Sequence, residues 1–170
     1  VHDNTNESKI KQVIDNWYKI NIVNKEYNGY ISNTVGFCGD RTVYGGGDGI
    51  QTNVDTYFGS YGRYLKNTAQ FTCPEPSRDL YTTIESMLGN KSLTYPIGLI
   101  TYDELTLAGI DQKHINKLSW VYSTEHYWTM SPSFFDGKSY AREWLFSSAG
   151  RLGQWNQVGF YAGIRPVINL

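Results

Sequence analysis

The clearest regularity in the chain is an apolar stripe between residues 9 and 20. Apolar side chains recur there at the i, i+3, i+4, i+7 and i+8 positions of a helix, on Ile10, Val13, Ile14, Trp17 and Tyr18. Asn4 and Glu7 have the spacing of a capping box just upstream. The pattern predicts an amphipathic helix. We expect its stripe to pack across a sheet, although a helix that docks on a partner would show the same stripe.

The next segments mix short apolar runs with glycine. Residues 30–44 have the pattern of one or two short strands. The glycine-rich stretch at 45–49 predicts a loop, because ordering glycine in regular structure costs much conformational entropy. Residues 56–64 alternate aromatic residues with glycine. We find no helix or strand period that accounts for the aromatic residues between 57 and 64.

A strand that leads directly into a helix is predicted at residues 96–108. The apolar run at 96–100 has the length of a short buried strand. Thr101 and Glu104 then have capping-box spacing, and Gly109 can close the helix. We expect a helix of about two turns over residues 101–108.

From residue 120 onward the pattern is that of strands. Apolar and aromatic residues gather at 120–130, 140–148 and 164–168, with glycines between them that predict turns. Pro166 lacks a backbone N–H and so predicts an edge strand or a bulge. The order of elements predicts an α+β fold with an antiparallel sheet, two helices and long irregular loops. The length fits a single domain over residues 1–170.

Charge and apolar-run length exclude several classes of protein. The 15 Lys and Arg against 16 Asp and Glu give a net charge of -1, so nothing predicts binding to nucleic acid or to an anionic membrane surface. No run reaches about 18 consecutive apolar residues, so we expect no direct membrane insertion of this segment. The sequence has no signal-peptide pattern and begins with Val1. We therefore expect a processed or trimmed start, with a leader or anchor removed.

The 2 cysteines, Cys38 and Cys73, do not complete a zinc-binding set with a third cysteine or a nearby histidine. They are either a disulfide, which an extracellular location would favour, or two buried free thiols.

Catalytic and metal-binding motifs are absent or weak. His126 beside Glu125 could act in acid–base catalysis, but such a pair is more often a solvated loop. Four oxygen-bearing residues near the glycine-rich loop could hold Ca²⁺, but their spacing is not that of an EF-hand; they are Asp40, Asp48, Asn53 and Asp55. We expect no metal and no cofactor, with calcium as the alternative. Arg165 predicts either the anchor of a buried hydrogen-bond network or an exposed edge arginine.

Aromatic residues make up 15% of the chain while charged residues make up 18%, and this surplus is where we look for a binding site. We expect Trp128 and Trp144 to belong to the core. The best candidates for ligand contact are Tyr57, Phe58, Tyr61 and Tyr64, with Asp48 in the adjacent glycine-rich loop.

Five motifs follow one another along the chain: WY at 17–18, FCGDR at 37–41, LTYPIGLITYDE at 93–104, YWTMSP at 127–132 and GIRPVINL at 163–170. In this order they resemble an uncharacterised domain family of Gram-positive, largely gut-dwelling bacteria. Members of that family look like secreted or surface proteins, some with a pilin-type or lipoprotein-type leader. Relatives carry cysteine in the segments that hold Cys38 and Cys73, and this favours the disulfide.

A more distant similarity rests on Trp155, Asn156, Gly159 and the stretch 163–166. These positions look like the end of C-type-lectin-like domains, a group that includes the formylglycine-generating enzymes. The similarity implies a twisted antiparallel sheet, two helices and a long loop region that displays ligand contacts. The enzymes of this group use cysteines near the C-terminal end, and this chain has none there. Calcium-dependent lectins use a Trp-Asn-Asp strand, and here Gln157 replaces the aspartate.

These observations together lead us to expect a non-enzymatic extracellular module for ligand binding or adhesion, part of a bacterial cell-surface or pilus-associated protein. Its partner would be a glycan or a host or bacterial surface protein. The alternatives are a structural pilin-type subunit and an enzyme of the formylglycine-generating-enzyme-like fold.

Overall fold

The computed structural model describes residues 7–170, except for 51–52, 87, 112 and 154–155. Helix α1 (Lys9–Asn21) begins after Ser8, whose side chain accepts a hydrogen bond from the Lys11 N–H at 3.0 Å. The predicted Asn4 cap lies outside the described residues. The helix packs with Ile14 and Tyr18 buried against Ile97 of strand β5 (Ile97–Leu99). The amphipathic helix and its packing on a strand are therefore confirmed.

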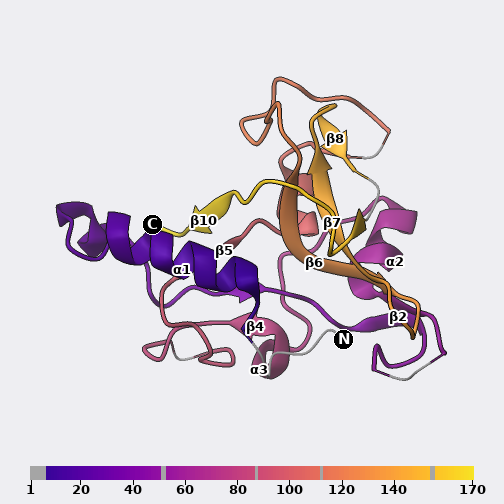
Figure 1. Ribbon diagram of the computed structural model, residues 1–170, viewed down its shortest axis with the longest axis horizontal. Helices are drawn as coiled ribbons and strands as arrows, with labels where there is room; N and C mark the ends of the chain where they lie inside the picture. The colour runs from indigo at the N-terminus through magenta and orange to yellow at the C-terminus, as the bar shows by residue number, and fades with distance from the viewer. Residues whose placement is uncertain (1–6, 51–52, 87, 112, 154–155) are drawn as a thin grey trace.

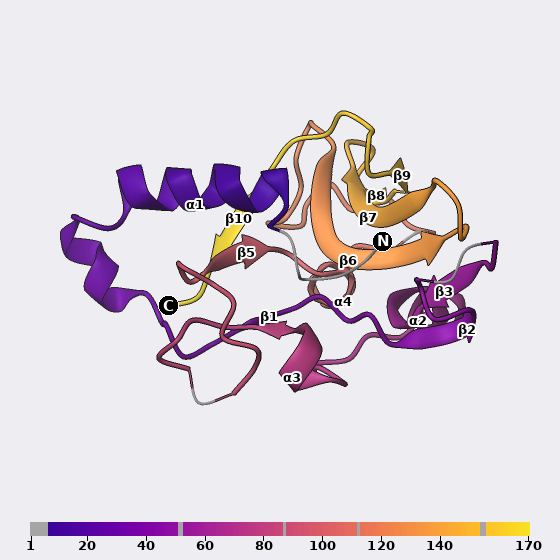
Figure 2. The same cartoon turned by 60° about the horizontal axis from the view of Figure 1, so that its bottom comes forward.

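Only two of the five residues of the predicted stripe on α1, Ile14 and Tyr18, are buried, however. Val13 and Trp17 face away from the core and are exposed. The reason is that the β-ribbon against which the helix packs is narrow. Among the described residues, strand β5 pairs only with the terminal strand β10 (Pro166–Ile168), and so narrow a ribbon covers a narrow face of the helix. In Figure 2, α1 lies over β10 and β5 on one side of the molecule.

The main sheet fills the other side of the molecule, where the long strands β6 and β7 are strongly curled (Figure 2). Its pairs are all antiparallel, in the order β2-β3-β6-β7-β8, with β9 also paired to β7. The strands are β2 (Val43–Gly46), β3 (Thr56–Phe58), β6 (Tyr127–Phe135), β7 (Ala141–Ser147), β8 (Arg151–Leu152) and β9 (Asn156–Gln157). The predicted α+β class and the antiparallel sheet are confirmed.

The terminal strand does not join the main sheet. Pro166 pairs with Leu99 and Ile168 with Ile97, so β10 lies in a separate two-stranded ribbon with β5. Both strands of such a ribbon are edges, which agrees with the edge position predicted from the proline. A second small ribbon joins β1 (Phe37–Cys38) to β4 (Leu80–Tyr81).

The strand–helix unit forms as predicted. Helix α4 (Tyr102–Leu107) follows β5 and opens with a complete capping box. The Thr101 hydroxyl accepts from the Glu104 N–H at 3.1 Å, and the Glu104 carboxylate accepts from the Thr101 N–H at 2.7 Å. Gly109 adopts a positive φ of 80° just after the helix, a conformation that glycine adopts without strain.

Three helical segments were not predicted. They are the 3₁₀ helix Glu26–Tyr30, helix α2 (Gly59–Lys66) and the short helix α3 (Pro76–Asp79). Helix α2 follows directly after β3, so residues 56–64 are a strand and a helix rather than a segment without a period. The sequence pattern did not indicate α2, because two of its eight residues are glycine, and glycine disfavours the interior of a helix.

The core surrounds Trp144, which is fully buried between α4 and the main sheet. Its indole N–H donates to the Ser60 hydroxyl at 2.8 Å, and Ser60 in turn donates to the Pro132 carbonyl. Trp128 is buried in a neighbouring cluster. The prediction that these two tryptophans belong to the core is confirmed, and the buried indole N–H has the partner that it requires.

A disulfide joins Cys38 of β1 to Cys73, as the sequence favoured. The bond ties the β1–β4 ribbon to the chain that leads into α3. Strand β4 and α3 lie next to each other in Figure 1. Disulfides persist in oxidising compartments, so the bond is compatible with an extracellular protein. Among the described residues, no helix is long and apolar enough to cross a membrane.

Candidate functional site

Three of the four predicted aromatic residues form a continuous row of rings. The Tyr57 ring lies 4.7 Å from Tyr61 and 5.0 Å from Phe134 of β6, centroid to centroid. The Tyr61 ring lies 6.0 Å from Tyr64, whose ring lies 4.8 Å from the buried Trp144. The row therefore runs from the surface of the sheet along α2 and into the core. We call Tyr57, Tyr61 and Tyr64 the tyrosine row.

A sequence signal for this row exists. Tyr57, Tyr61 and Tyr64 are spaced i, i+4 and i+7, which is the spacing of one helical face. Tyr57 belongs to β3, and the other two lie on α2. The strand-to-helix turn after Phe58 brings all three rings together, so the spacing produces the row although only part of it is helical.

The other two candidates take different places. Phe58 is 1% exposed and packs in the interior, so it cannot touch a ligand in this conformation. It points inward because successive side chains of a strand alternate between faces, and its neighbour Tyr57 points outward. Asp48 is exposed, and its carboxylate accepts from the Ile50 N–H at 2.8 Å within the glycine-rich loop. It therefore helps to shape that loop.

Burial raises the pKa of Tyr61 above its ordinary value of 10.0, and the nearby phenols of Tyr57, Tyr64 and Tyr44 raise it further. The ring contacts place these hydroxyls near each other, and two phenolate charges side by side would repel. Tyr61 thus stays a neutral phenol at ordinary pH. It can donate and accept hydrogen bonds while its ring offers an apolar face.

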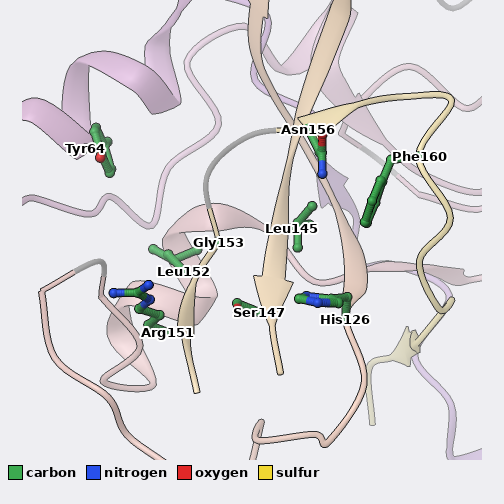
Figure 3. A pocket seen from close by; sticks show the side chains of 9 residues that line it. All are labelled: Tyr64, His126, Leu145, Ser147, Arg151, Leu152, Gly153, Asn156 and Phe160. Carbon is green, nitrogen blue, oxygen red and sulfur yellow. The ribbon is translucent and has the colours of Figure 1, made fainter. Parts of the chain in front are cut away.

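Tyr64 also lines a pocket of about 410 Å³ at the end of the main sheet (Figure 3). Its walls come from α2, β7, β8, β9 and the chain on either side of them. The lining residues are Tyr64, His126, Leu145, Ser147, Arg151, Leu152, Gly153, Asn156 and Phe160. This size suits a small polar ligand or one or two sugar rings.

The pocket combines polar groups with an aromatic wall. In the view of Figure 3, Arg151 lies along β8 on one side of β7, and His126 and Phe160 lie on the other side. The His126 ring meets the Phe160 ring edge-on, with centroids 6.3 Å apart. Its Nδ1 accepts a long hydrogen bond of 3.4 Å from the Ser148 N–H. Arg151 is exposed, and within the described part of the chain no carboxylate pairs with its guanidinium.

Sequence reasoning did not single out Arg151, Asn156 or Phe160 as ligand contacts. Arg151 lies on β8, Asn156 on β9 and Phe160 in the chain that follows β9. The pairing of β7 with both β8 and β9 brings these segments together. Trp155, part of the lectin-like motif, lies outside the described residues. No local period relates the three positions, and their residue types are common on protein surfaces, so no sequence signal pointed to them.

Of the oxygen-bearing residues proposed for calcium, Asp40 is engaged by other groups of the protein. Asp40 is buried, and its carboxylate lies 2.7 Å from Arg63 Nη1 and accepts from the Thr42 N–H. Among the described residues, no group of three or more His, Cys, Asp or Glu side chains converges as a metal site. Asp40 is thus already engaged by a guanidinium, which competes with any cation for the same oxygen.

Comparison with known proteins identifies no relative, since no family model, curated protein or solved structure matches this chain.

Proposed function

We propose that this chain is a non-enzymatic extracellular binding or adhesion module, with a C-type-lectin-like arrangement, of a bacterial cell-surface or pilus-associated protein. The observation that carries the proposal is the tyrosine row that ends at the pocket. Three tyrosine rings in contact lead from the surface to a cavity that presents a guanidinium, an amide, an imidazole and a second aromatic face.

A glycan is the ligand that this chemistry fits best. Sugars have apolar C–H faces that stack on aromatic rings and hydroxyls that pair with polar side chains. Phe160 and Tyr64 offer the rings, while Arg151 and Asn156 offer donors and acceptors around the same cavity. A surface-protein ligand remains the competing partner, and it would contact the exposed part of the row rather than fill the pocket.

The disulfide and the curled antiparallel sheet support the extracellular and lectin-like parts of the proposal. A disulfide that closes a 35-residue separation is typical of an oxidising compartment. The antiparallel sheet and the long segments between strands fit the arrangement that the sequence similarity implies, whereas the chain has more helical segments than the two of that arrangement.

The test is a glycan array followed by titration calorimetry on each positive sugar. Phe160→Ala removes the exposed aromatic wall and should weaken binding by about tenfold, since stacking on one ring contributes on the order of 1 kcal/mol. Tyr30→Ala is the control: Tyr30 is an aromatic residue that is 75% exposed, against 43% for Phe160, and it lies in the 3₁₀ helix Glu26–Tyr30 outside the pocket lining. A blank array together with a blank pulldown against host and bacterial surface proteins would overturn the proposal.

A structural pilin-type subunit is the second candidate, and one observation favours it. Val13, Trp17 and Ile20 form an exposed apolar face along α1, which a neighbouring subunit could cover. Sedimentation measured over a range of protein concentrations separates the two functions. Self-association that Trp17→Glu abolishes would support the function as a structural subunit. A protein that is monomeric at every concentration would favour the binding module instead.

A further inference from the structure

Residues 113–120, which we call the tip loop, carry three exposed large apolar side chains. Ile115 is 64% exposed, Leu118 is 98% exposed and Trp120 is 76% exposed. The loop lies between α4 and β6, at the outer end of the molecule beyond β8 (Figure 1). Three large apolar side chains in water within six residues are costly, and such clusters usually mark a surface that another phase or molecule covers.

The tip loop is held in place by hydrogen bonds that point back to the body of the protein. Asn116 carries most of them: its side-chain oxygen accepts from the N–H groups of Leu118 and Ser119, and its side-chain amide donates to the Gly109 carbonyl at 3.1 Å. The Asn116 N–H donates to the Gly150 carbonyl at 2.7 Å. These bonds fix the backbone and leave the apolar side chains to project outward.

Arg165 forms hydrogen bonds with the backbone at the end of the tip loop. Its guanidinium donates to the Val121 carbonyl at 2.6 Å and to the Trp120 carbonyl at 3.2 Å. The Tyr127 hydroxyl donates to the same Val121 carbonyl at 2.8 Å. Arg165 is therefore the network anchor that one interpretation of the sequence predicted. Its effect is to present the Trp120 indole on a rigid support.

Basic residues outnumber acidic ones in and next to the tip loop. Lys113 and Lys117 lie in the loop, and the one acidic neighbour in sequence, Asp111, is engaged by the backbone N–H groups of Lys113 and His114 and by the His114 ring. Arg151 follows Gly150, the residue to which the loop is hydrogen-bonded. The net charge of the whole chain is -1, so this local excess of positive charge is not visible in the composition. An apolar tip with a basic rim is complementary to an anionic lipid surface.

We propose that the tip loop inserts into the surface of an anionic lipid bilayer. Leu118 and Ile115 enter the boundary of the acyl region, the Trp120 ring lies at the level of the headgroups, and the lysines contact lipid phosphates. A protein partner fits less well, because a stable protein interface needs about 800 Å² of surface on each side, and three side chains on a projecting loop offer much less.

The experiment measures binding to lipid vesicles by co-sedimentation and by tryptophan fluorescence. The protein should bind vesicles of phosphatidylcholine that contain about 30% phosphatidylglycerol and bind pure phosphatidylcholine several-fold more weakly. Binding should shift the tryptophan emission to shorter wavelength, and Trp120→Phe should remove that shift while the other four tryptophans remain.

Variants separate the tip from the rest of the surface. Leu118→Asp should reduce vesicle binding by at least about tenfold, because it places a charge where a large apolar side chain enters lipid. Leu88→Asp makes the same change at a leucine that is 70% exposed elsewhere, and it should bind like the wild type. Lys113→Glu should weaken binding to the anionic vesicles by about fivefold or more and leave binding to phosphatidylcholine nearly unchanged.

The inference is tested separately from the pocket, with which the tip region shares only Arg151 among the residues named here. Phe160→Ala, which tests the proposed function, should leave vesicle binding intact. Failure of the wild type to bind anionic vesicles, or equal loss with Leu118→Asp and Leu88→Asp, would overturn the proposal. Self-association that Leu118→Asp abolishes, without any vesicle binding, would also overturn it and assign the loop to a protein contact.

Discussion

Two arginines of the protein have contrasting surroundings. Arg63, on α2, is nearly buried: its Nε and Nη2 each donate to the Asp103 carboxylate at 2.7 Å, and its Nη1 lies 2.7 Å from Asp40. Arg151, on β8 at the pocket, is exposed, and in the described ranges no carboxylate pairs with it. The residue type is the same, but Arg63 holds the fold together while Arg151 faces solvent.

The comparison teaches that a site is indicated by side chains that the fold leaves available. The cluster around Arg63 is rich in charge, yet its charged groups are ion-paired with one another across α2, α4 and the chain before β2. Asp79 forms a similar closed cluster with Arg41 and Arg78. The pocket holds fewer charges, but its polar groups face a cavity. The candidate site is therefore distinguished by polar side chains that face a cavity rather than by a high density of charged groups.

The largest effect is expected from Arg63→Ala. It would leave the Asp40 and Asp103 carboxylates buried without their cation, and breaking a buried pair in this way costs about 3–5 kcal/mol. Urea denaturation measures the loss in the free energy of unfolding. Lys66→Ala is the control on the same helix, since Lys66 is exposed and its loss should cost less than about 0.5 kcal/mol. Equal losses from the two variants would contradict the contrast drawn here.

Removal of the disulfide should have the next largest effect. The bond closes a 35-residue separation, so the Cys38→Ala/Cys73→Ala double variant should lose about 2–4 kcal/mol through a less constrained unfolded chain. Denaturation of the wild type with and without reductant provides a second measurement. A reductant that lowers wild-type stability but not that of the double variant would confirm the assignment, whereas no change in the wild type would refute it.

A smaller, pH-dependent effect is expected from Asp79. Burial alone would raise the pKa of its carboxyl, but hydrogen bonds from Arg78 and Arg41 outweigh burial and hold the pKa below the ordinary 3.8. A lowered native pKa stabilises the ionised form, so this contribution is complete above the unfolded-state pKa and is lost as the pH falls through the native pKa. The free energy of unfolding should decline in that acidic range. Asp79→Asn should flatten the decline, and an unchanged slope would exclude Asp79 as its source.

The smallest effect on stability is expected from Arg151→Ala. The free energy of unfolding should change by less than about 0.5 kcal/mol, because the side chain is exposed. Binding of any sugar found on the array should nevertheless weaken by about tenfold, since a charge-assisted hydrogen bond contributes roughly 1.5–3 kcal/mol. Calorimetry on the variant provides both values. A large loss of stability would mean that Arg151 belongs with Arg63 among the structural arginines.

Where a pattern was local, the sequence predicted the fold well. The amphipathic helix at α1 and the capping box at Thr101 follow from spacings of three or four residues, which a helix brings together without help from the rest of the chain. The tryptophan core could be inferred from residue type. Helix α2 could not, because its two glycines, Gly59 and Gly62, disfavour helix locally. Gly62 lies where an added Cβ would meet the Tyr44 ring at 2.3 Å, so packing requires glycine there.

The candidate site was predicted only in part. Tyr57, Tyr61 and Tyr64 were singled out and lie together, whereas Phe58 is buried because strand alternation turns it inward. The pocket that Tyr64 reaches was not foreseen. Its other walls come from residues 126–160, and no sequence period relates a helix near residue 60 to a hairpin near residue 151.

By itself the sequence determined the α+β class, the first helix, the strand–helix unit and the aromatic row, because each depends on short-range spacing or composition. Tertiary structure alone decided that β10 pairs with β5 and that Arg63 is ion-paired while Arg151 faces solvent. It also decided that Ile115, Leu118 and Trp120 are exposed. These outcomes depend on contacts between segments far apart in the chain. The free energy of such contacts belongs to the assembled fold, so no local pattern records it.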